Sequence, residues 1–123
     1  MPAPYQHLPI WRDANRLLVA VEQVVRKFSR YHKYTLGTEM RRKAMHICQQ
    51  IIRIYHAGSR PVPMLQRLLT LIEDCKLQIQ LAKELKAFQN FAHFQQLAEL
   101  AVLLGKQGGG WLRKARSEVV SVA

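Results

Sequence analysis

Apolar residues recur every three or four positions through four successive segments of this chain, which is the period of an amphipathic helix. The periodicity predicts helices over residues 9–29, 35–57, 62–88 and 91–118, and Pro9 suits the first position of a helix. The apolar face of the first helix consists of Ile10, Ala14, Leu17, Val21, Val24 and Phe28. No stretch shows a competing alternation of apolar and polar residues, so the sequence predicts an all-α fold.

Short links separate the four segments, and they carry residues typical of helix ends. Thr35 is placed to cap the second helix, Gly58 to close it, and the fourth helix should start shortly after Asn90. A chain of 123 residues has the length of one domain. Because short links make successive helices antiparallel, we expect a single antiparallel up-down four-helix bundle over residues 1–123.

Three consecutive glycines, residues 108–110, interrupt the fourth segment. Each glycine in a helix interior costs up to about 1 kcal/mol relative to alanine, which favours a break. The apolar period nevertheless continues from Leu104 through Gly108, Trp111, Ala115 and Val119. We therefore expect one continuous helix, in which Gly108 allows a neighbour to approach closely and Trp111 packs there. The final residues, from position 117 onward, should fray.

The third segment is apolar on two sides. Its core stripe is Leu65, Leu68, Ile72, Cys75, Ile79 and Ala82. Leu77, Leu81 and Leu85 lie on a different side and widen the apolar surface beyond what one face of a small bundle can bury. We expect these three leucines to contact a second copy of the chain, so the protein should be a homo-oligomer.

The chain is strongly basic, with 19 Lys and Arg against 8 Asp and Glu, a net charge of +11. Such a charge favours binding to polyanions. Between residues 26 and 43, Glu39 is the only acid. The candidate residues for binding nucleic acid or a protein partner are Arg26, Lys27, Arg30, Lys33, Arg41, Arg42, Lys43, Arg53, Arg113, Lys114 and Arg116.

Two interpretations of these cations stay open. Arg41, Arg42 and Lys43 fall in the second turn of the second predicted helix, near the positive end of its macrodipole, which does not favour them. A polar stripe then continues through Arg42, His46, Gln49, Arg53 and His56. It is either a solvated outer face or a binding surface, and its lack of acids supports the second as much as the first. Tyr31, His32 and Tyr34 lie among the cations and either stack on unpaired bases or pack and cap the bundle.

The acidic, histidine and cysteine residues form no recognisable catalytic or metal-binding pattern. Glu73 and Asp74 are adjacent rather than on one helical face, and no two of the five histidines stand four residues apart as a zinc pair. Cys48 and Cys75 lie in apolar helical patterns typical of buried thiols. No nucleotide-binding fingerprint is present. We expect no enzymatic activity, no metal and no cofactor.

No window approaches the roughly 18 consecutive apolar residues of a membrane-spanning helix. The opening residues "MPAPYQHLPIW" have neither the basic nor the apolar region of a secretory signal, so we expect a cytoplasmic protein. Binding to a membrane surface fits less well than binding to nucleic acid, because the apolar faces are already used in the core.

Three stretches, "LPIWRDANRLLVAVEQV", "KYTLGTEMRRKAMHI" and "LLGKQGGGWLRK", carry a family resemblance. Over roughly residues 7–116 the chain resembles the four-helix-bundle family that includes the accessory variability determinant of diversity-generating retroelements and the proteins encoded within intervening sequences of bacterial ribosomal RNA genes. The residues that match the family pattern are Tyr34, Leu36, Gly37, Arg41, Arg42, Gly105, Gly110 and Trp111. The triple glycine departs from the one or two glycines usual there.

The basic character and the Gly-Trp ending resemble the retroelement branch more than the ribosomal RNA branch. The resemblance implies a homopentameric ring without catalysis of its own. It also implies association with the retroelement reverse transcriptase and with RNA or DNA during mutagenic copying of a template RNA. A ribosomal RNA intervening-sequence protein and a protein-only oligomeric scaffold remain the alternatives.

Overall fold

The computed structural model describes residues 4–58 and 61–122, and this part of the chain is all helical, without a strand. Four long helices form the body, with a short 3-10 helix before the first and a short α-helix between the first two. In chain order the elements are η1 (Pro4–His7), α1 (Pro9–Val25), α2 (Arg30–Lys33), α3 (Leu36–His56), α4 (Val62–Glu84) and α5 (Phe91–Val122). None of the helices in the described part is long and apolar enough to cross a membrane.

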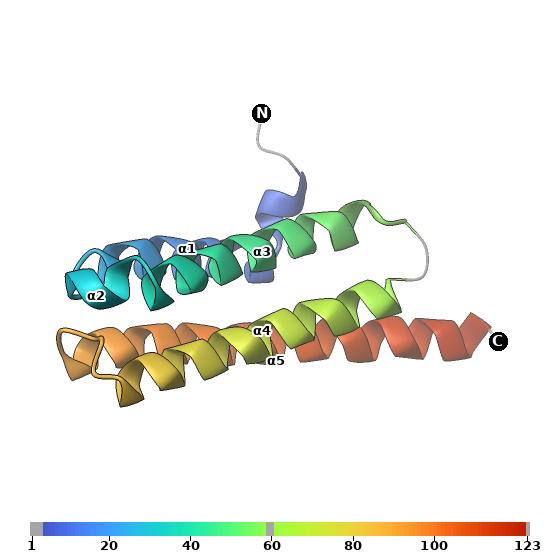
Figure 1. The fold of residues 1–123 in the computed structure, drawn as a ribbon. Coiled ribbons are helices and arrows are strands. Elements are labelled where there is room, and N and C mark those ends of the chain that lie inside the picture. Colours follow the sequence, from blue (N-terminus) through green and yellow to red (C-terminus); the bar gives the residue numbers. More distant parts are fainter. Residues whose placement is uncertain (1–3, 59–60, 123) are drawn as a thin grey trace.

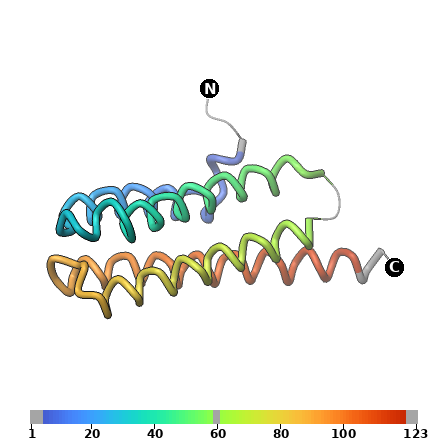
Figure 2. The backbone as a smooth tube through the Cα atoms, in the orientation of Figure 1, coloured from blue at the N-terminus to red at the C-terminus, as the bar shows by residue number. Residues whose placement is uncertain are grey.

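The four long helices pack as an antiparallel bundle (Figure 1). α1 packs against α3 and α5, and α4 packs against the same two helices. The smooth trace in Figure 2 shows α1 beside α3 in one layer and α4 beside α5 in the other, each helix running opposite to the one before it. The predicted four-helix bundle is confirmed.

The core forms where the predicted apolar stripes meet at the bundle axis. Leu17 of α1, Ile47 of α3, Leu68 of α4 and Leu97 of α5 are all fully buried. The six core residues predicted for the third segment are all buried as well. Val119, expected to continue the stripe of the fourth segment, is about half exposed, because the C-terminal end of α5 extends past the N-terminal end of α4 (Figure 1).

Two helices end earlier than the periodicity predicts. α1 ends at Val25 rather than at residue 29, because the amides of Lys27 and Phe28 turn to the carbonyls three residues before them. This tighter turn still buries Phe28. α2 then forms inside the segment that the sequence predicted as a link.

α4 ends at Glu84 rather than at residue 88, with Lys86 in the left-handed region at φ 58°. The amide of Ala87 donates to the carbonyl of Ala82, and the amide of Lys86 donates to that of Lys83. These two bonds make a Schellman ending, which normally selects glycine at the left-handed position.

Of the three predicted helix-end residues, Gly58 and Asn90 act as expected and Thr35 does not. Gly58 adopts φ 75° after α3, and the Asn90 side-chain oxygen accepts a hydrogen bond from the His93 amide at 3.0 Å. Thr35 stands at the N-cap of α3 without capping it. Its hydroxyl instead donates to the Tyr31 carbonyl at 3.0 Å, which holds α2 against the start of α3.

α5 runs through the three glycines, as the apolar period predicted. Gly108 is buried, and a Cβ added there would lie 3.0 Å from Leu69 Cδ2 of α4. Trp111 is half-buried against the core. α5 continues through Val122, so the residues from 117 to 122 are helical, and position 123 lies outside the described residues.

Candidate nucleic-acid interface

Figure 1 shows the end of the bundle where α2 is found, and six cations belong to the segments that lie there. Antiparallel packing brings the ends of α1 and α4 to the same place. We call this surface the basic tip and define it by Arg26, Lys27, Arg30, Lys33, Lys83 and Lys86. Sequence reasoning found the first four and missed the two lysines of α4. The up-down order of the helices could have indicated them, because alternate helices of such a bundle end on the same side.

The Arg41, Arg42 and Lys43 triplet is divided among three carboxylates. Arg41 Nε donates to Glu22 Oε2 of α1 at 2.6 Å. Lys43 Nζ lies 3.4 Å from Asp74 Oδ2 of α4. Arg42 pairs within α3, at 3.5 Å from Glu39 Oε1.

Two of the three paired carboxylates, Glu22 and Asp74, come from neighbouring helices, so the local sequence gave no sign of them. Arg41 and Lys43 join α3 to its neighbours, Arg41 through a pair on the bundle surface and Lys43 through a partly buried one. Two of the three cations of the triplet therefore have a structural role. Arg42, paired with the exposed Glu39, continues the polar stripe that is exposed along the outer face of α3, as predicted.

Part of the charge without a close carboxylate lies at the basic tip. Arg26 reaches Glu22 only at 3.8 Å and shares that carboxylate with Arg41. No carboxylate of the described residues lies within 4.0 Å of Lys27, Arg30 or Lys33. Lys27 and Arg30 are exposed and Lys33 is half-buried, so the tip presents cations of the predicted set to an external anion.

Aromatic side chains stand among the tip cations. Tyr31 is 79% exposed, Tyr34 is 69% exposed, and Phe91 at the start of α5 is 63% exposed. His32 is only partly exposed, with its ring 5.1 Å from that of Tyr31. The packing role that the sequence left open therefore does not apply to the rings of Tyr31 and Tyr34.

A separate aromatic cluster fills the interior of the same end. Phe28 meets Phe88 edge to face at 5.5 Å, and Phe88 meets Phe94 at 5.8 Å. Lys83 Nζ lies 4.8 Å from the centre of the Phe94 ring. The two helical hairpins are thus joined at this end without any contribution from the exposed tyrosines.

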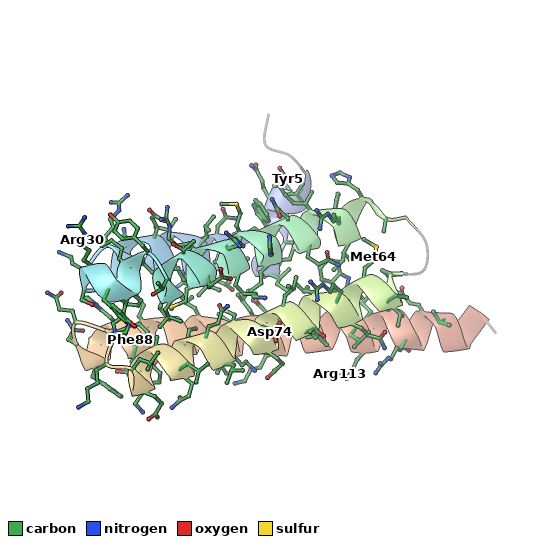
Figure 3. The ribbon with its side chains drawn as sticks, in the orientation of Figure 1. Tyr5, Arg30, Met64, Asp74, Phe88 and Arg113 are labelled. Atoms are coloured by element: carbon green, nitrogen blue, oxygen red, sulfur yellow. The ribbon has the colours of Figure 1, made fainter. Side chains whose placement is uncertain are left out.

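The predicted cations near the C-terminus lie far from the basic tip. Arg113 is 22 residues beyond Phe91, which corresponds to about 33 Å along a helix. Figure 3 shows Arg30 at the α2 end of the bundle and Arg113 in the half that contains the C-terminus. Arg53 lies near the C-terminal end of α3, also away from the tip. The structure therefore does not bring Arg53, Arg113, Lys114 and Arg116 together with the tip, so the candidate set is not one continuous surface.

The three leucines predicted for an interface lie outside the core of the single chain. Leu77 is 57% exposed, Leu81 46% and Leu85 56%, and they stand one turn apart along α4. The monomer therefore leaves an apolar stripe uncovered, as the sequence predicted.

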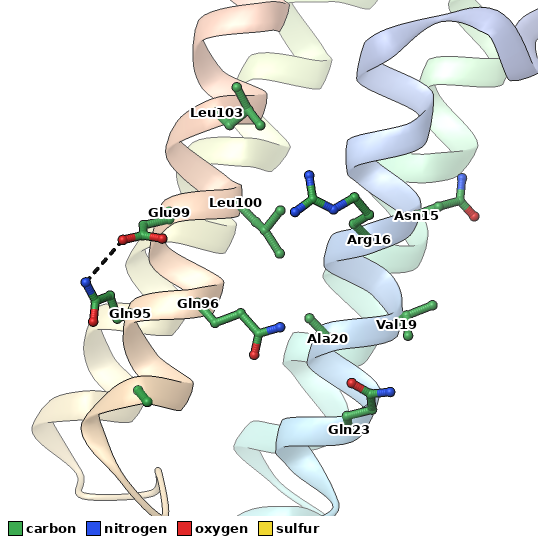
Figure 4. Close-up of a pocket in the computed structure, with 11 residues that line it drawn as sticks. Asn15, Arg16, Val19, Ala20, Gln23, Gln95, Gln96, Glu99, Leu100 and Leu103 are labelled. Atoms are coloured by element: carbon green, nitrogen blue, oxygen red, sulfur yellow. Dashed lines mark hydrogen bonds between the residues drawn. The ribbon is translucent and has the colours of Figure 1, made fainter.

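A groove of about 870 Å³ lies between α1 and α5 (Figure 4). Val19, Ala20, Leu100 and Leu103 supply its apolar lining. Polar side chains surround them, and Gln95 donates to Glu99 at 3.2 Å. The sequence analysis did not identify this groove, because its walls come from the first and last helices.

Neither thiol is suited to chemistry at neutral pH. Burial raises the pKa of Cys48 to about 11 and that of Cys75 to about 12. Within the described ranges, no three His, Cys, Asp or Glu side chains come together as ligands for a metal ion.

Comparison of the chain with models of protein families and with curated proteins finds no match.

Proposed function

We propose that this protein is a non-catalytic accessory protein that binds nucleic acid through the basic tip. The observation that carries the proposal is the gathering of Lys27, Arg30 and Lys33 at one end of the bundle, with no carboxylate of the described residues within 4.0 Å. Cations that neutralise phosphates release condensed counterions, and a few such contacts supply most of a non-specific affinity.

The biological setting of the proposal comes from the sequence resemblance. By that resemblance, the protein acts beside the reverse transcriptase of a diversity-generating retroelement and contacts the template RNA or its DNA copy during mutagenic copying. Such a role would be carried out in the cytoplasm. The described part of the chain offers no groove-reading helix outside the bundle, so we expect binding with little sequence preference.

The proposal includes a homo-oligomer. The exposed stripe of Leu77, Leu81 and Leu85 supports it, because a second copy that covers these side chains would remove apolar surface from water. The resemblance favours a ring of five. A ring would repeat the net charge of +11 in every copy and strengthen the attraction for a polyanion.

A protein-only scaffold is the second candidate. The ion pairs of Arg41 with Glu22 and of Lys43 with Asp74 favour it, because they use cations that the sequence had assigned to nucleic acid. Under this alternative the basic tip would face an acidic surface of the reverse transcriptase. A ribosomal RNA intervening-sequence protein, the remaining alternative, would be encoded within a ribosomal RNA gene instead of next to a reverse transcriptase.

The proposal is tested by titrating a labelled structured RNA and a DNA of matched sequence with the full chain at several salt concentrations. Light scattering in the same buffer gives the mass of the binding species. We expect an oligomer that binds both, with log affinity falling linearly with log salt concentration. A folded oligomer that binds neither nucleic acid but captures the neighbouring reverse transcriptase would support the scaffold instead.

A further inference from the structure

We infer that the basic tip is a site for single-stranded RNA or DNA, in which Tyr31 and Tyr34 stack on unpaired bases. This inference rests on the proposed function and deepens it, because it names the form of nucleic acid that the tip accepts. The inference rests on two observations, which are the exposure of the two rings and the positive charges around them.

The fold does not need these two rings. Phe28, Phe88 and Phe94 already form the aromatic interior of this end, and Phe28 is 4% exposed. A tyrosine ring gains free energy by leaving water, so it is normally packed when a core is near. Tyr31 and Tyr34 stand next to such a core and remain exposed, which leaves their faces available to a ligand.

Cations and aromatics alternate along this segment. Lys27, Arg30 and Lys33 are three residues apart, and Tyr31 and Tyr34 each follow one of the last two directly. Proteins that hold single strands combine cations along the backbone with aromatic faces under successive bases. The tip offers both kinds of contact within eight residues, from position 27 to position 34.

Hydrogen bonds hold this segment in one conformation. The amides of His32 and Lys33 both donate to the Ser29 carbonyl, at 3.1 Å and 2.9 Å. The Thr35 hydroxyl donates to the Tyr31 carbonyl at 3.0 Å. The backbone that carries the two tyrosines is therefore ordered before any ligand arrives, which lowers the entropic cost of binding.

Stacking distinguishes single strands from duplexes. The faces of paired bases are covered by their neighbours in a duplex, whereas unpaired bases can be splayed out onto aromatic side chains. Phosphate contacts alone are made by both forms. Removal of the tyrosine rings should therefore weaken binding to single strands and leave binding to duplexes unchanged.

The test uses the full chain and a labelled oligouridylate of about 15 nucleotides, which is within the length one small binding surface covers, beside a duplex of the same length. Tyr31→Ala and Tyr34→Ala should each weaken binding of the oligouridylate about fivefold or more. Tyr31→Phe and Tyr34→Phe keep the ring and should leave affinity unchanged. Met45→Ala on the exposed side of α3 is the control for loss of an exposed apolar side chain.

The outcomes separate this site from the proposed function. If the alanine variants bind the oligouridylate as tightly as the wild type, the stacking site is wrong while the proposed function stands. If the wild type binds neither oligouridylate nor duplex, the proposed function fails and the site fails with it. If the alanine variants lose only capture of a purified reverse transcriptase, the rings belong to a protein interface and the inference is overturned.

Photocrosslinking of the wild type gives a second measurement that does not depend on a variant. An oligonucleotide with 4-thiouridine should crosslink to the peptides that contain Tyr31 and Tyr34. Crosslinks found only on other peptides would overturn the assignment.

Discussion

Lys43 of α3 and Asp74 of α4 meet across the helix interface, with Lys43 Nζ 3.4 Å from Asp74 Oδ2. The Lys43 side chain is only 20% exposed, so its methylene stem is largely covered by the bundle. Arg42, next to it in the sequence, is exposed, and among the described residues it pairs only with Glu39 of its own helix. Adjacent cations in one basic triplet therefore have different roles, one in holding helices together and one on the surface.

Lys43→Ala should lower the free energy of unfolding by about 1 kcal/mol, through loss of a partly buried ion pair and of stem packing. Arg42→Ala should leave it nearly unchanged, because an exposed pair contributes little. Urea denaturation followed by circular dichroism measures both. Equal destabilisation by the two substitutions would show that the α3–α4 ion pair contributes no more to the free energy of unfolding than an exposed pair.

Gly37→Ala should destabilise the protein by about 1–3 kcal/mol, as expected for overpacking. A Cβ at this position would lie 2.6 Å from Val25 Cγ1 and 3.3 Å from the His32 carbonyl oxygen. The backbone carbonyl cannot move away without disturbing α2. Thermal unfolding measures the effect.

Gly109→Ala is the matched control for Gly37→Ala. Only the Arg113 guanidinium lies within 4 Å of a Cβ added at Gly109, and the position is helical. Alanine should therefore stabilise the protein by up to about 1 kcal/mol. A Gly109→Ala variant less stable than the wild type would contradict the open space seen beside this position of α5.

Asp13 should contribute to stability at neutral pH and lose that contribution in acid. Burial alone would raise its pKa, but hydrogen bonds from Gln107 and Arg16, with the charges of Arg16 and Arg12, hold the pKa below its ordinary value of 3.8. A carboxyl whose pKa is lowered by folding stabilises the protein above its unfolded pKa, and this stabilisation disappears as pH falls through the folded pKa.

Asp13→Asn should therefore be less stable than the wild type at about pH 7, and the difference should shrink below about pH 4. Urea denaturation at several pH values gives the two curves. A difference that stays constant across this range would mean that the charge of Asp13 has no part in stability.

Leu77→Gln combined with Leu81→Gln should reduce the oligomeric mass without loss of helix content. Both side chains are exposed in the single chain, so polar replacements do not disturb its core. Each leucine is already about half covered, so an interface that buried the rest would gain about half of the 1.5–3 kcal/mol of a fully buried side chain. Light scattering reports the mass, and Met45→Gln is the control. An unchanged mass would exclude this stripe as the interface.

The helical part of the fold was predictable because each helix carries its own apolar period. Even the glycines at 108–110 did not obscure it, since Gly108 falls on the buried face and tolerates the close approach of Leu69. The early ends of α1 and α4 were not predictable from period alone. Phe28 keeps the helical phase of α1 and is buried, yet it lies beyond the last turn of that helix. Ala87 comes five residues after Ala82, out of phase, and is buried in the turn that ends α4.

The candidate site was predictable only where its parts are close in sequence. The cluster from Arg26 to Lys33 was visible, whereas the pairing of Arg41 with Glu22 spans 19 residues and that of Lys43 with Asp74 spans 31. A count of neighbouring acids could not detect carboxylates that arrive from other helices. The separation of Arg53 and the C-terminal cations from the tip likewise follows from the length of the helices rather than from any local pattern.

The central claim is that nucleic acid binds at the basic tip, and the slope of log Kd against log salt concentration for duplex DNA tests it most directly. Each phosphate contact contributes about 0.9 to that slope, so the triple variant Lys27→Ala, Arg30→Ala and Lys33→Ala should lower it by up to about 2.7. A second triple variant, Arg53→Ala, Arg113→Ala and Arg116→Ala, removes the same charge from positions away from the tip and should keep nearly the slope of the wild type. Equal loss of slope in the two variants, or no loss in the first, would contradict a binding site at the tip.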